Sequence, residues 1–507
     1  MRTRLAISAF TTSVTFMIVT LVIGIVSTPI FLRLLGDERV GAFRVATDWA
    51  AYLVLFELGL SGALRARFAK VVSQSEEATA AAFAAGVVMY RRVTVWTIAA
   101  ASGFAFMLPW VIPVEPSLRP ELTVAWLLLA ATSFGLLLGP IRPLLEGLQR
   151  GYIINNLLIV QSISITAVSL YFACNGFGIV SQALGTLVGS LLMAGGLYGC
   201  LRKTNPMLCC QLLRSDASVD EMKQLSKLNF PTFASRMSGQ VGVMSDNIII
   251  GFILGPPAVV PFFLTQRIAS VAQGLLQSFS GSSWAGLADL YHRQQMVLLQ
   301  ARVLELTRLI TLVAVVVLAP ILVFNRDFVT LWVGGERFGG EWLTLLAVIN
   351  AFLLSIVSLW GLLLAGTEKI GLVAPVSVAS AVVNVVVSVP ATYAFGIIGP
   401  LLGTFVAMVL IQGTWIPSLL RTHFGIRRRT MFAAMFNPWL LTGPLIGLVW
   451  WAVHNHPILQ PSNWIELAVG VSVLSVTLLL VQWRLCFDTE DRQLWKRRIL
   501  DYAGIGV

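Results

Sequence analysis

The chain has 507 residues, of which 57% are hydrophobic and only 12% are charged, and its formal net charge is +11. An average soluble domain carries about twice that charged share, so the composition excludes an ordinary soluble protein. The positive charge does not require nucleic acid as a partner, because basic residues beside anionic lipid headgroups are usual in membrane proteins.

Apolar segments that are long enough to cross a bilayer, about 20 residues each, follow one another along the chain. We expect membrane-spanning helices near residues 10–32, 46–64, 93–113, 122–144, 153–174, 181–201, 230–254, 259–283, 304–324, 342–365, 370–394, 400–420, 434–454 and 464–484. Segments of this length are too long for barrel strands. The first begins with Arg2 and Arg4 like a secretory signal, but it lacks a small-residue cleavage site and is retained as a helix. The sequence predicts an all-α polytopic membrane protein with about 14 transmembrane helices.

Lysine and arginine indicate the orientation of these helices. Most of them fall at the helix ends and loops on the side of the amino terminus, including Arg65, Arg67, Lys70, Arg91, Arg92, Arg202, Lys203, Arg214, Lys223, Lys227, Arg427, Arg428, Arg429 and the basic residues of 492–498. Such an excess is typical of cytoplasmic loops. We therefore expect both termini in the cytoplasm.

The sequence contains an internal repeat. Residues 176–188 match residues 394–406 with seven of thirteen positions identical, including the pair Gly185 and Gly403. Earlier positions match at an offset of 219, so that Leu35-Gly36 corresponds to Leu254-Gly255. This offset covers six helices, an even number, so the two halves enter the membrane in the same direction. Parallel repeats of this kind are related by a pseudo-twofold axis along the membrane normal and indicate a transporter.

The repeat divides the chain into four parts. We expect an N-terminal six-helix bundle at 1–201, a basic cytoplasmic linker at 202–229, a second six-helix bundle at 230–433, and two extra helices with a cytoplasmic tail at 434–507. Within the bundles, the small-residue spacing of Gly185 and Gly189, repeated in Gly403 and Ala407, favours close helix contacts.

Two groups of residues resemble a known family. Residues 27–38 (Ser-Thr-Pro-Ile-Phe-Leu-Arg-Leu-Leu-Gly-Asp-Glu), Gly41, Phe43 and residues 57–61 are similar to the opening of the bacterial polysaccharide transporter family, the O-antigen and exopolysaccharide repeat-unit flippases. Residues 246–251 and Leu254-Gly255, continuing to Arg267-Ile268, are similar to its second half. The resemblance covers essentially the whole chain. It departs at Glu57, where an aspartate is expected, so the reach of that carboxylate differs.

The resemblance implies a bacterial inner-membrane flippase that moves polyprenyl-pyrophosphate-linked oligosaccharide from the inner to the outer leaflet. Its partners would be that saccharide, membrane lipids and a polysaccharide polymerase with its chain-length regulator. The same superfamily includes multidrug extruders and peptidoglycan-precursor flippases, which remain alternatives. A non-transporting membrane scaffold is a further alternative function.

Arginine suits the pyrophosphate of such a substrate, because its guanidinium binds phosphate oxygens bidentately. Arg236 and Arg267 are the substrate-binding candidates, although Arg236 could instead extend to the cytoplasmic interface. Asp48 and Arg267 occupy equivalent positions of the repeat with opposite charge. We expect them to form an outer gate pair, or each to meet lipid headgroups separately.

Two carboxylates are candidates for coupling transport to an ion gradient, because ionisable groups inside a membrane often bind transported ions. Asp246 could bind a proton or sodium, or it could be a helix-end carboxylate bonded to Asn247 or to a neighbouring hydroxyl. Glu57 could have the same role, or it could be a structural partner of Arg65. Arg142, between Pro140 and Pro143, could line a cavity in a broken helix or mark the inner end of a helix.

The sequence lacks the motifs of common enzyme classes. There is no phosphate-binding Gly-x-x-x-x-Gly-Lys-Ser/Thr loop, no Gly-x-Ser-x-Gly and no His-Glu-x-x-His. His454 and His456 are too few for a metal site, and the cysteines do not predict a periplasmic disulfide. We expect no enzyme activity, catalytic residue, cofactor or metal.

Overall fold

The computed structural model describes residues 2–57, 59–72, 75–212, 217–223, 225, 244–367 and 370–486. Within these ranges the chain forms helices and turns without any strand. It divides into two compact units, Met1–Val260 and Pro261–Val507, which are described separately below. The all-helical class that the composition predicts is therefore confirmed.

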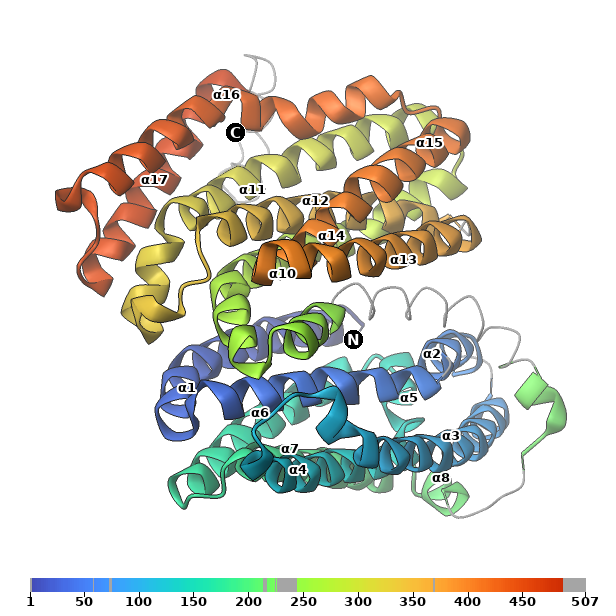
Figure 1. Ribbon diagram of the computed structural model, residues 1–507. Helices are drawn as coiled ribbons and strands as arrows, with labels where there is room; N and C mark the ends of the chain where they lie inside the picture. The colour runs from blue at the N-terminus through green and yellow to red at the C-terminus, as the bar shows by residue number, and fades with distance from the viewer. Residues whose placement is uncertain are drawn as a thin grey trace. The chain divides into compact units, whose positions relative to one another are not determined.

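Unit 1 is built from helices that follow the predicted apolar segments (Figure 1). In chain order these are α1 (Arg2–Tyr52), the 3₁₀ helix η1 (Leu53–Glu57), α2 (Leu60–Val71), α3 (Glu76–Val111), η2 (Pro116–Leu118), α4 (Arg119–Ala131), η3 (Thr132–Leu138), α5 (Ile141–Gly147), α6 (Gly151–Cys174), α7 (Ile179–Thr204), α8 (Pro206–Gln211) and the short helix Met244–Ile253.

Unit 2 begins within α10 (Pro256–His292), at Pro261. It continues with α11 (Met296–Val333), η4 (Gly335–Arg337), α12 (Glu341–Gly366), α13 (Ile370–Phe395), η5 (Gly396–Ile398), α14 (Gly399–Ala407), the π-helix η6 (Met408–Gln412), α15 (Gly413–Phe424), α16 (Arg428–Asn455), η7 (Pro457–Leu459) and α17 (Trp464–Leu485).

Ten helical runs in the described part of the chain are long and apolar enough to cross a membrane. Two of them, Thr11–Glu57 with 47 residues and Gly371–Phe424 with 54 residues, are each long enough for two crossings of about 20 residues. These runs overlap the predicted spans 10–32 and 46–64, and 370–394 and 400–420, although the last part of the span 46–64 lies in the separate helix α2. The predicted span 230–254 is described only from residue 244 onward. The chain is thus a multi-pass membrane protein.

Matching glycines of the repeat have matching backbone conformations. Gly36 interrupts α1 with φ 77°, and its counterpart Gly255 has φ 91°. Gly178 and Gly396, which precede α7 and α14, have φ values of 53° and 64°. Residues other than glycine rarely adopt such positive φ angles, so glycine is favoured at each of these positions. The two halves therefore share local geometry where their sequences match.

The predicted small-residue contacts are also confirmed, each inside its own unit. A Cβ atom on Gly185 would lie 2.0 Å from Ser169 Oγ, where α7 packs against α6. A Cβ atom on Gly403 would lie 2.0 Å from Ser388 Oγ, where α14 packs against α13. Ser169 and Ser388 are themselves separated by the repeat offset of 219. Glycine thus allows the same close helix pair to form twice.

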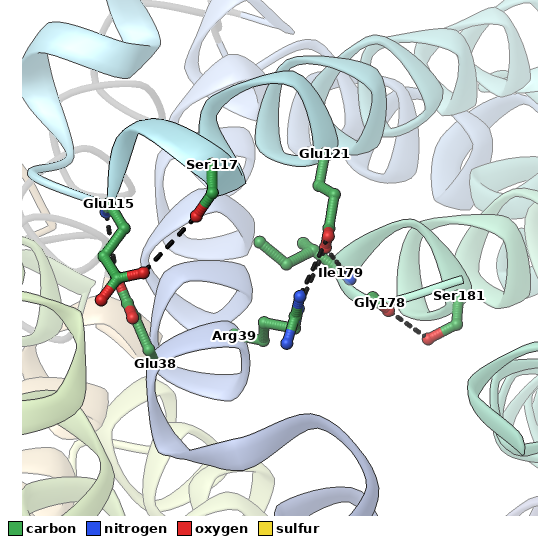
Figure 2. A network of polar contacts seen from close by, with 8 residues as sticks. All are labelled: Glu38, Arg39, Glu115, Ser117, Glu121, Gly178, Ile179 and Ser181. Atoms are coloured by element: carbon green, nitrogen blue, oxygen red, sulfur yellow. Dashed lines mark hydrogen bonds and ion pairs between the residues drawn. The ribbon is translucent and has the colours of Figure 1, made fainter. Parts of the chain in front are cut away.

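A polar network ties three helices of unit 1 together (Figure 2). Glu121, in the first turn of α4, accepts two hydrogen bonds of 3.1 Å from Arg39 of α1 and one of 3.1 Å from the Ile179 backbone N–H at the start of α7. A carboxylate is favourable at a helix N-terminus. A Cβ atom on Gly178 would lie 2.1 Å from Glu121 Oε2, so this network requires glycine there. It fixes the second part of α1, beyond Gly36, to α4 and α7.

The part of the predicted linker that the structure describes is folded against unit 1. Helix α8 contacts α3 and α7, and Arg67 of α2 makes a two-point ion pair with Glu221. Leu208 and Leu225 are buried in the hydrophobic core of this unit. Apolar residues within a basic sequence therefore attach the described linker residues to the ends of α2, α3 and α7.

In unit 2, the helices that lie beyond the repeat pack on α11. Both α16 and α17 contact α11 and each other (Figure 1). Their shared core includes Val315, Val323, Ile446 and Leu474. His454 of α16 adds a polar contact, with its Nε2 atom 3.2 Å from Glu341 Oε1 at the start of α12. The two extra helices are thus part of the second compact unit.

Candidate functional site

A polar cavity of about 490 Å³ lies inside unit 1, a volume in the range of small-molecule sites. Helix α4 ends at Ala131, and the chain continues as a 3₁₀ helix to Leu138 before α5 begins at Ile141. This interruption provides part of the wall. Hydroxyl and amide side chains line much of the cavity, namely Ser61, Thr97, Thr132, Ser133, Gln161 and Ser190. Such a lining suits a hydroxyl-rich ligand.

Glu57 is a buried carboxylate on the cavity wall, with 9% of the residue exposed. It is the last residue of η1, which continues α1 after Tyr52. Tyr90 of α3, which is 1% exposed, donates its hydroxyl hydrogen bond to Glu57 Oε1. Tyr90 therefore holds the Glu57 carboxylate at the cavity wall.

Two arginines on the same wall share one carboxylate. Arg65 Nε of α2 lies 2.6 Å from Glu146 Oε2, and Arg142 Nε of α5 lies 3.5 Å from Glu146 Oε1. The side chains of both arginines are about half exposed, at 55% and 50%. Each guanidinium has five N–H donors, more than one shared carboxylate can accept. Arg65 and Arg142 can therefore bind an additional anion or sugar hydroxyls.

A second polar group lies where the helix Met244–Ile253 meets α1. Asn247 Nδ2 donates a 2.6 Å hydrogen bond to Asp48 Oδ2, and Arg44 Nε lies 3.9 Å from the same oxygen. Asp48, Asp246 and Asn247 are all buried, between 5% and 7% exposed. Among the described residues, the Asn247 amide donates to Asp48, and the Oδ1 atom of Asp246 has no hydrogen-bond partner.

An apolar groove of about 360 Å³ lies in unit 2 between α10, α11 and α17. Its walls are almost entirely aliphatic or aromatic, with Ile268 and Leu275 from α10, Phe324 and Phe328 from α11, and Val471 from α17. Arg267 directly precedes Ile268 on α10 and is half-buried. A hydrocarbon chain matches this lining, and a cationic residue stands next to its α10 wall in the sequence.

The predicted site residues fall in different places. Glu57 lines the polar cavity together with Arg65, and Arg142 also lies there, as the broken-helix interpretation suggested. Glu146, whose role was not anticipated, is the described partner of Arg65. Asp48 belongs to unit 1 and Arg267 to unit 2, so their gate pair stays a prediction. Arg236 lies outside the described residues.

Histidine, cysteine and carboxylate side chains do not gather into a metal-binding group. Within the residues that the structure describes, no set of three or more of them could hold a metal ion. The candidate sites are the polar cavity of unit 1, the apolar groove of unit 2 and the buried group of Asp48, Asp246 and Asn247.

Solved structures with the same fold are transport proteins. A lipid II flippase MurJ in an inward closed conformation matches with a TM-score of 0.71 at 12% identity, covering 95% of this chain and 98% of its own. An outward-facing multidrug resistance MATE transporter of the MOP superfamily matches with a TM-score of 0.58 at 12% identity, covering 87% of this chain and 96% of its own. A eukaryotic MATE transporter has a TM-score of 0.56 at 13% identity, with coverages of 86% and 98%.

Comparison with curated proteins gives no match. The family model described as "Polysaccharide biosynthesis protein" matches residues 9–285, which is more than half of the chain. The match includes the helices that form the polar cavity and the whole of the helix Met244–Ile253. The chain therefore belongs to the polysaccharide biosynthesis protein family, and it has the polytopic fold of the MurJ and MATE transporters.

Proposed function

We propose that this protein is a flippase that moves polyprenyl-pyrophosphate-linked oligosaccharide from the inner to the outer leaflet of the bacterial inner membrane. Transport would follow alternating access, with both termini in the cytoplasm, and would supply a surface polysaccharide such as O-antigen or exopolysaccharide. A polymerase and a chain-length regulator would act on the product. The protein itself would catalyse no covalent chemistry.

The apolar groove between α10, α11 and α17 is the observation that carries this proposal. A polyprenyl tail is a long hydrocarbon and needs an apolar surface to follow while its head crosses the membrane. The groove supplies that surface, and α17, which belongs to the two helices beyond the repeat, forms one wall of it. A transporter of small soluble cations would have no need for such a wall.

The polar cavity of unit 1 supports the same assignment for the head of the substrate. Its hydroxyl and amide lining can hydrogen-bond sugars, and Arg65 and Arg142 offer donors to a phosphate or an acidic sugar. Arg267, beside the groove in sequence, and Arg236 are proposed to contact the pyrophosphate. We further propose that Asp48 and Arg267 close the outer side of the pathway while the cavity faces inward.

Two other cargoes follow from the structural similarities. The lipid II flippase likeness favours a peptidoglycan precursor, which also consists of a sugar head on a polyprenyl pyrophosphate. The MATE likeness favours an organic cation. The family match to polysaccharide biosynthesis supports our preference for the saccharide of a surface polymer over these two cargoes.

Purified protein in liposomes tests the assignment. A fluorescent polyprenyl-pyrophosphate oligosaccharide is incorporated, and its exposure to a quencher outside the vesicles is followed, with efflux of an organic-cation dye measured in parallel. We expect saccharide flipping without dye efflux, and loss of flipping in Arg267→Ala. Arg293→Ala is the matched control, because Arg293 lies directly after the end of the same helix, is exposed and is paired with Asp289.

Dye efflux without flipping would assign the protein to drug extrusion. The absence of both activities from a correctly folded preparation would indicate a scaffold and would contradict the proposal. Equal flipping by a peptidoglycan precursor and by the oligosaccharide would show that the head group is not the selected feature.

A further inference from the structure

The contact between residues 41–52 of α1 and the helix Met244–Ile253 forms a tight antiparallel seam. Gly41 contacts Pro256, Val45 contacts Gly251, and Asp48 contacts Asn247, so the two segments run in opposite directions. A Cβ atom on Gly41 would lie 1.9 Å from the Pro256 carbonyl oxygen, and one on Gly251 would lie 2.5 Å from Val45 Cγ2. Two glycines thus allow the backbones to approach closely around the buried polar residues.

Asp246 is a buried carboxylate within this seam. The residue is 7% exposed, and its Oδ1 atom is buried without a hydrogen-bond partner among the residues that the structure describes. Among the described residues, the titratable groups that interact with it are Asp48 and Tyr52 of α1, which lie one helical turn apart on the same face. Arg44 lies one turn before Asp48 on that face, but its side chain is 47% exposed and it approaches Asp48.

These contacts are incompatible with two ionised carboxylates. Burying an ionised carboxylate without a partner is very unfavourable, and two carboxylates that share a site do not both ionise. Asp48 receives the Asn247 amide and faces Arg44, and both of these interactions favour its charged form. Asp246 has neither, so Asp246 is the residue that must be neutral.

We infer that Asp48 and Asp246 form a proton-binding site, in which Asp246 carries the proton while the helix Met244–Ile253 lies against α1. Opening the seam would admit water to Asp246 and allow the proton to leave, and closing it again would require a proton. The site thus links protonation to the packing of two helices. Resting on the proposed flippase function, this would couple the transport cycle to a proton gradient.

The repeat explains why this contact can move during a cycle. By the repeat offset of 219, the helix Met244–Ile253 is the equivalent of residues 25–34 of α1. It therefore belongs by sequence to the predicted second half, although it packs on a helix of the first. A proton at this seam would be bound or released as the predicted halves change their contact.

Infrared spectroscopy tests the site without any transport measurement. Full-length protein in lipid nanodiscs at neutral pH should show the C=O stretch of a protonated carboxylic acid, and this band should shift in deuterated water. We expect Asp246→Asn to remove the band. Asp289→Asn is the matched control, because Asp289 is an exposed aspartate paired with Arg293, and it should leave the band unchanged.

Two further variants distinguish loss of the protonated acid from misfolding of the mutant protein. Asp246→Glu should retain a protonated-acid band, and Asp48→Asn should weaken it because the neighbouring negative charge that favours the neutral form is gone. A wild-type protein without the band, or a band that survives Asp246→Asn in a monodisperse preparation, would overturn the inference. A carboxylate signal of Asp246 that responds to sodium alone would also overturn it. Failure of saccharide flipping would leave the proton site standing.

Discussion

Substitution of Gly185 by alanine tests the structural basis of the repeated helix pair. The new Cβ atom would lie 2.0 Å from Ser169 Oγ, 2.5 Å from the Ile165 carbonyl oxygen and 3.0 Å from the Ser169 backbone nitrogen. Two of these three neighbours are backbone atoms, so α7 has to move away from α6. Overpacking of this kind costs about 1–3 kcal/mol. Better helix propensity of alanine offsets at most about 1 kcal/mol of it.

The control for this substitution lies on the same helix. Gly195→Ala adds the same methyl group where no atom lies within 4 Å, so it should be neutral or slightly stabilising. Thermal unfolding in detergent, followed by tryptophan fluorescence, should show Gly185→Ala several degrees below Gly195→Ala. Gly403→Ala should resemble Gly185→Ala, since its Cβ atom would lie 2.0 Å from Ser388 Oγ. Equal midpoints for Gly185→Ala and Gly195→Ala would refute the close-contact reasoning.

Three further predictions concern unit 1. Tyr90→Phe removes the hydrogen bond that Tyr90 donates to the buried Glu57 carboxylate, so it should destabilise the protein by about 1–3 kcal/mol in chemical unfolding and slow flipping. Glu121→Ala removes the Arg39 pair and the carboxylate at the start of α7, and because both side chains are about one-third exposed it should cost only about 1 kcal/mol in the same assay. Burial raises the pKa of the Cys209 thiol, so its alkylation at neutral pH, measured by mass spectrometry, should be slower than that of a free thiol and should accelerate at higher pH.

The predictions for Tyr90→Phe and Glu121→Ala each have a control variant in unit 1. Tyr198→Phe changes an exposed tyrosine of α7 and should leave stability and flipping unaltered. Ser117→Ala removes only an exposed 3.4 Å hydrogen bond beside the Glu121 network and should also be silent (Figure 2). Stability losses in these controls equal to those of Tyr90→Phe or Glu121→Ala would contradict the assigned contacts. Rapid alkylation of Cys209 at neutral pH would contradict the raised pKa of its thiol.

The helical fold and its repeat could be predicted because their signals are local. Apolar segments of bilayer length identify spanning helices directly, and small residues repeated at an offset of 218 or 219 mark close helix contacts and positive backbone angles. Gly178 and Gly185 show this most clearly, since their counterparts Gly396 and Gly403 have the same conformation or contact. The internal break in α1 at Gly36 and the short helix α8 needed tertiary structure to be located.

The candidate site could be predicted only in part, because partners come from distant helices. The sequence indicates Glu57 as an ion-coupling carboxylate or a partner of Arg65, whereas Tyr90, 33 positions later, donates a hydrogen bond to it in the structure. Arg142 and Glu146 are four residues apart on α5, a spacing that predicts an ion pair, but no sequence spacing reveals that Glu146 also pairs with Arg65 of α2. The partner of Asp48 in this structure, Asn247, is 199 positions away. Residue type indicates which groups need a partner, and packing decides which partner they obtain.

The most direct test of the proposed cargo measures flipping when the apolar groove is filled. Val471→Trp places a large ring in the groove wall on α17, whereas Val476→Trp places the same ring on an exposed position of that helix. In liposomes with a labelled polyprenyl-pyrophosphate oligosaccharide, we predict flipping by the wild-type protein and Val476→Trp, and its loss in Val471→Trp. A wild-type protein that does not flip the saccharide, or undiminished flipping in Val471→Trp, would contradict the account.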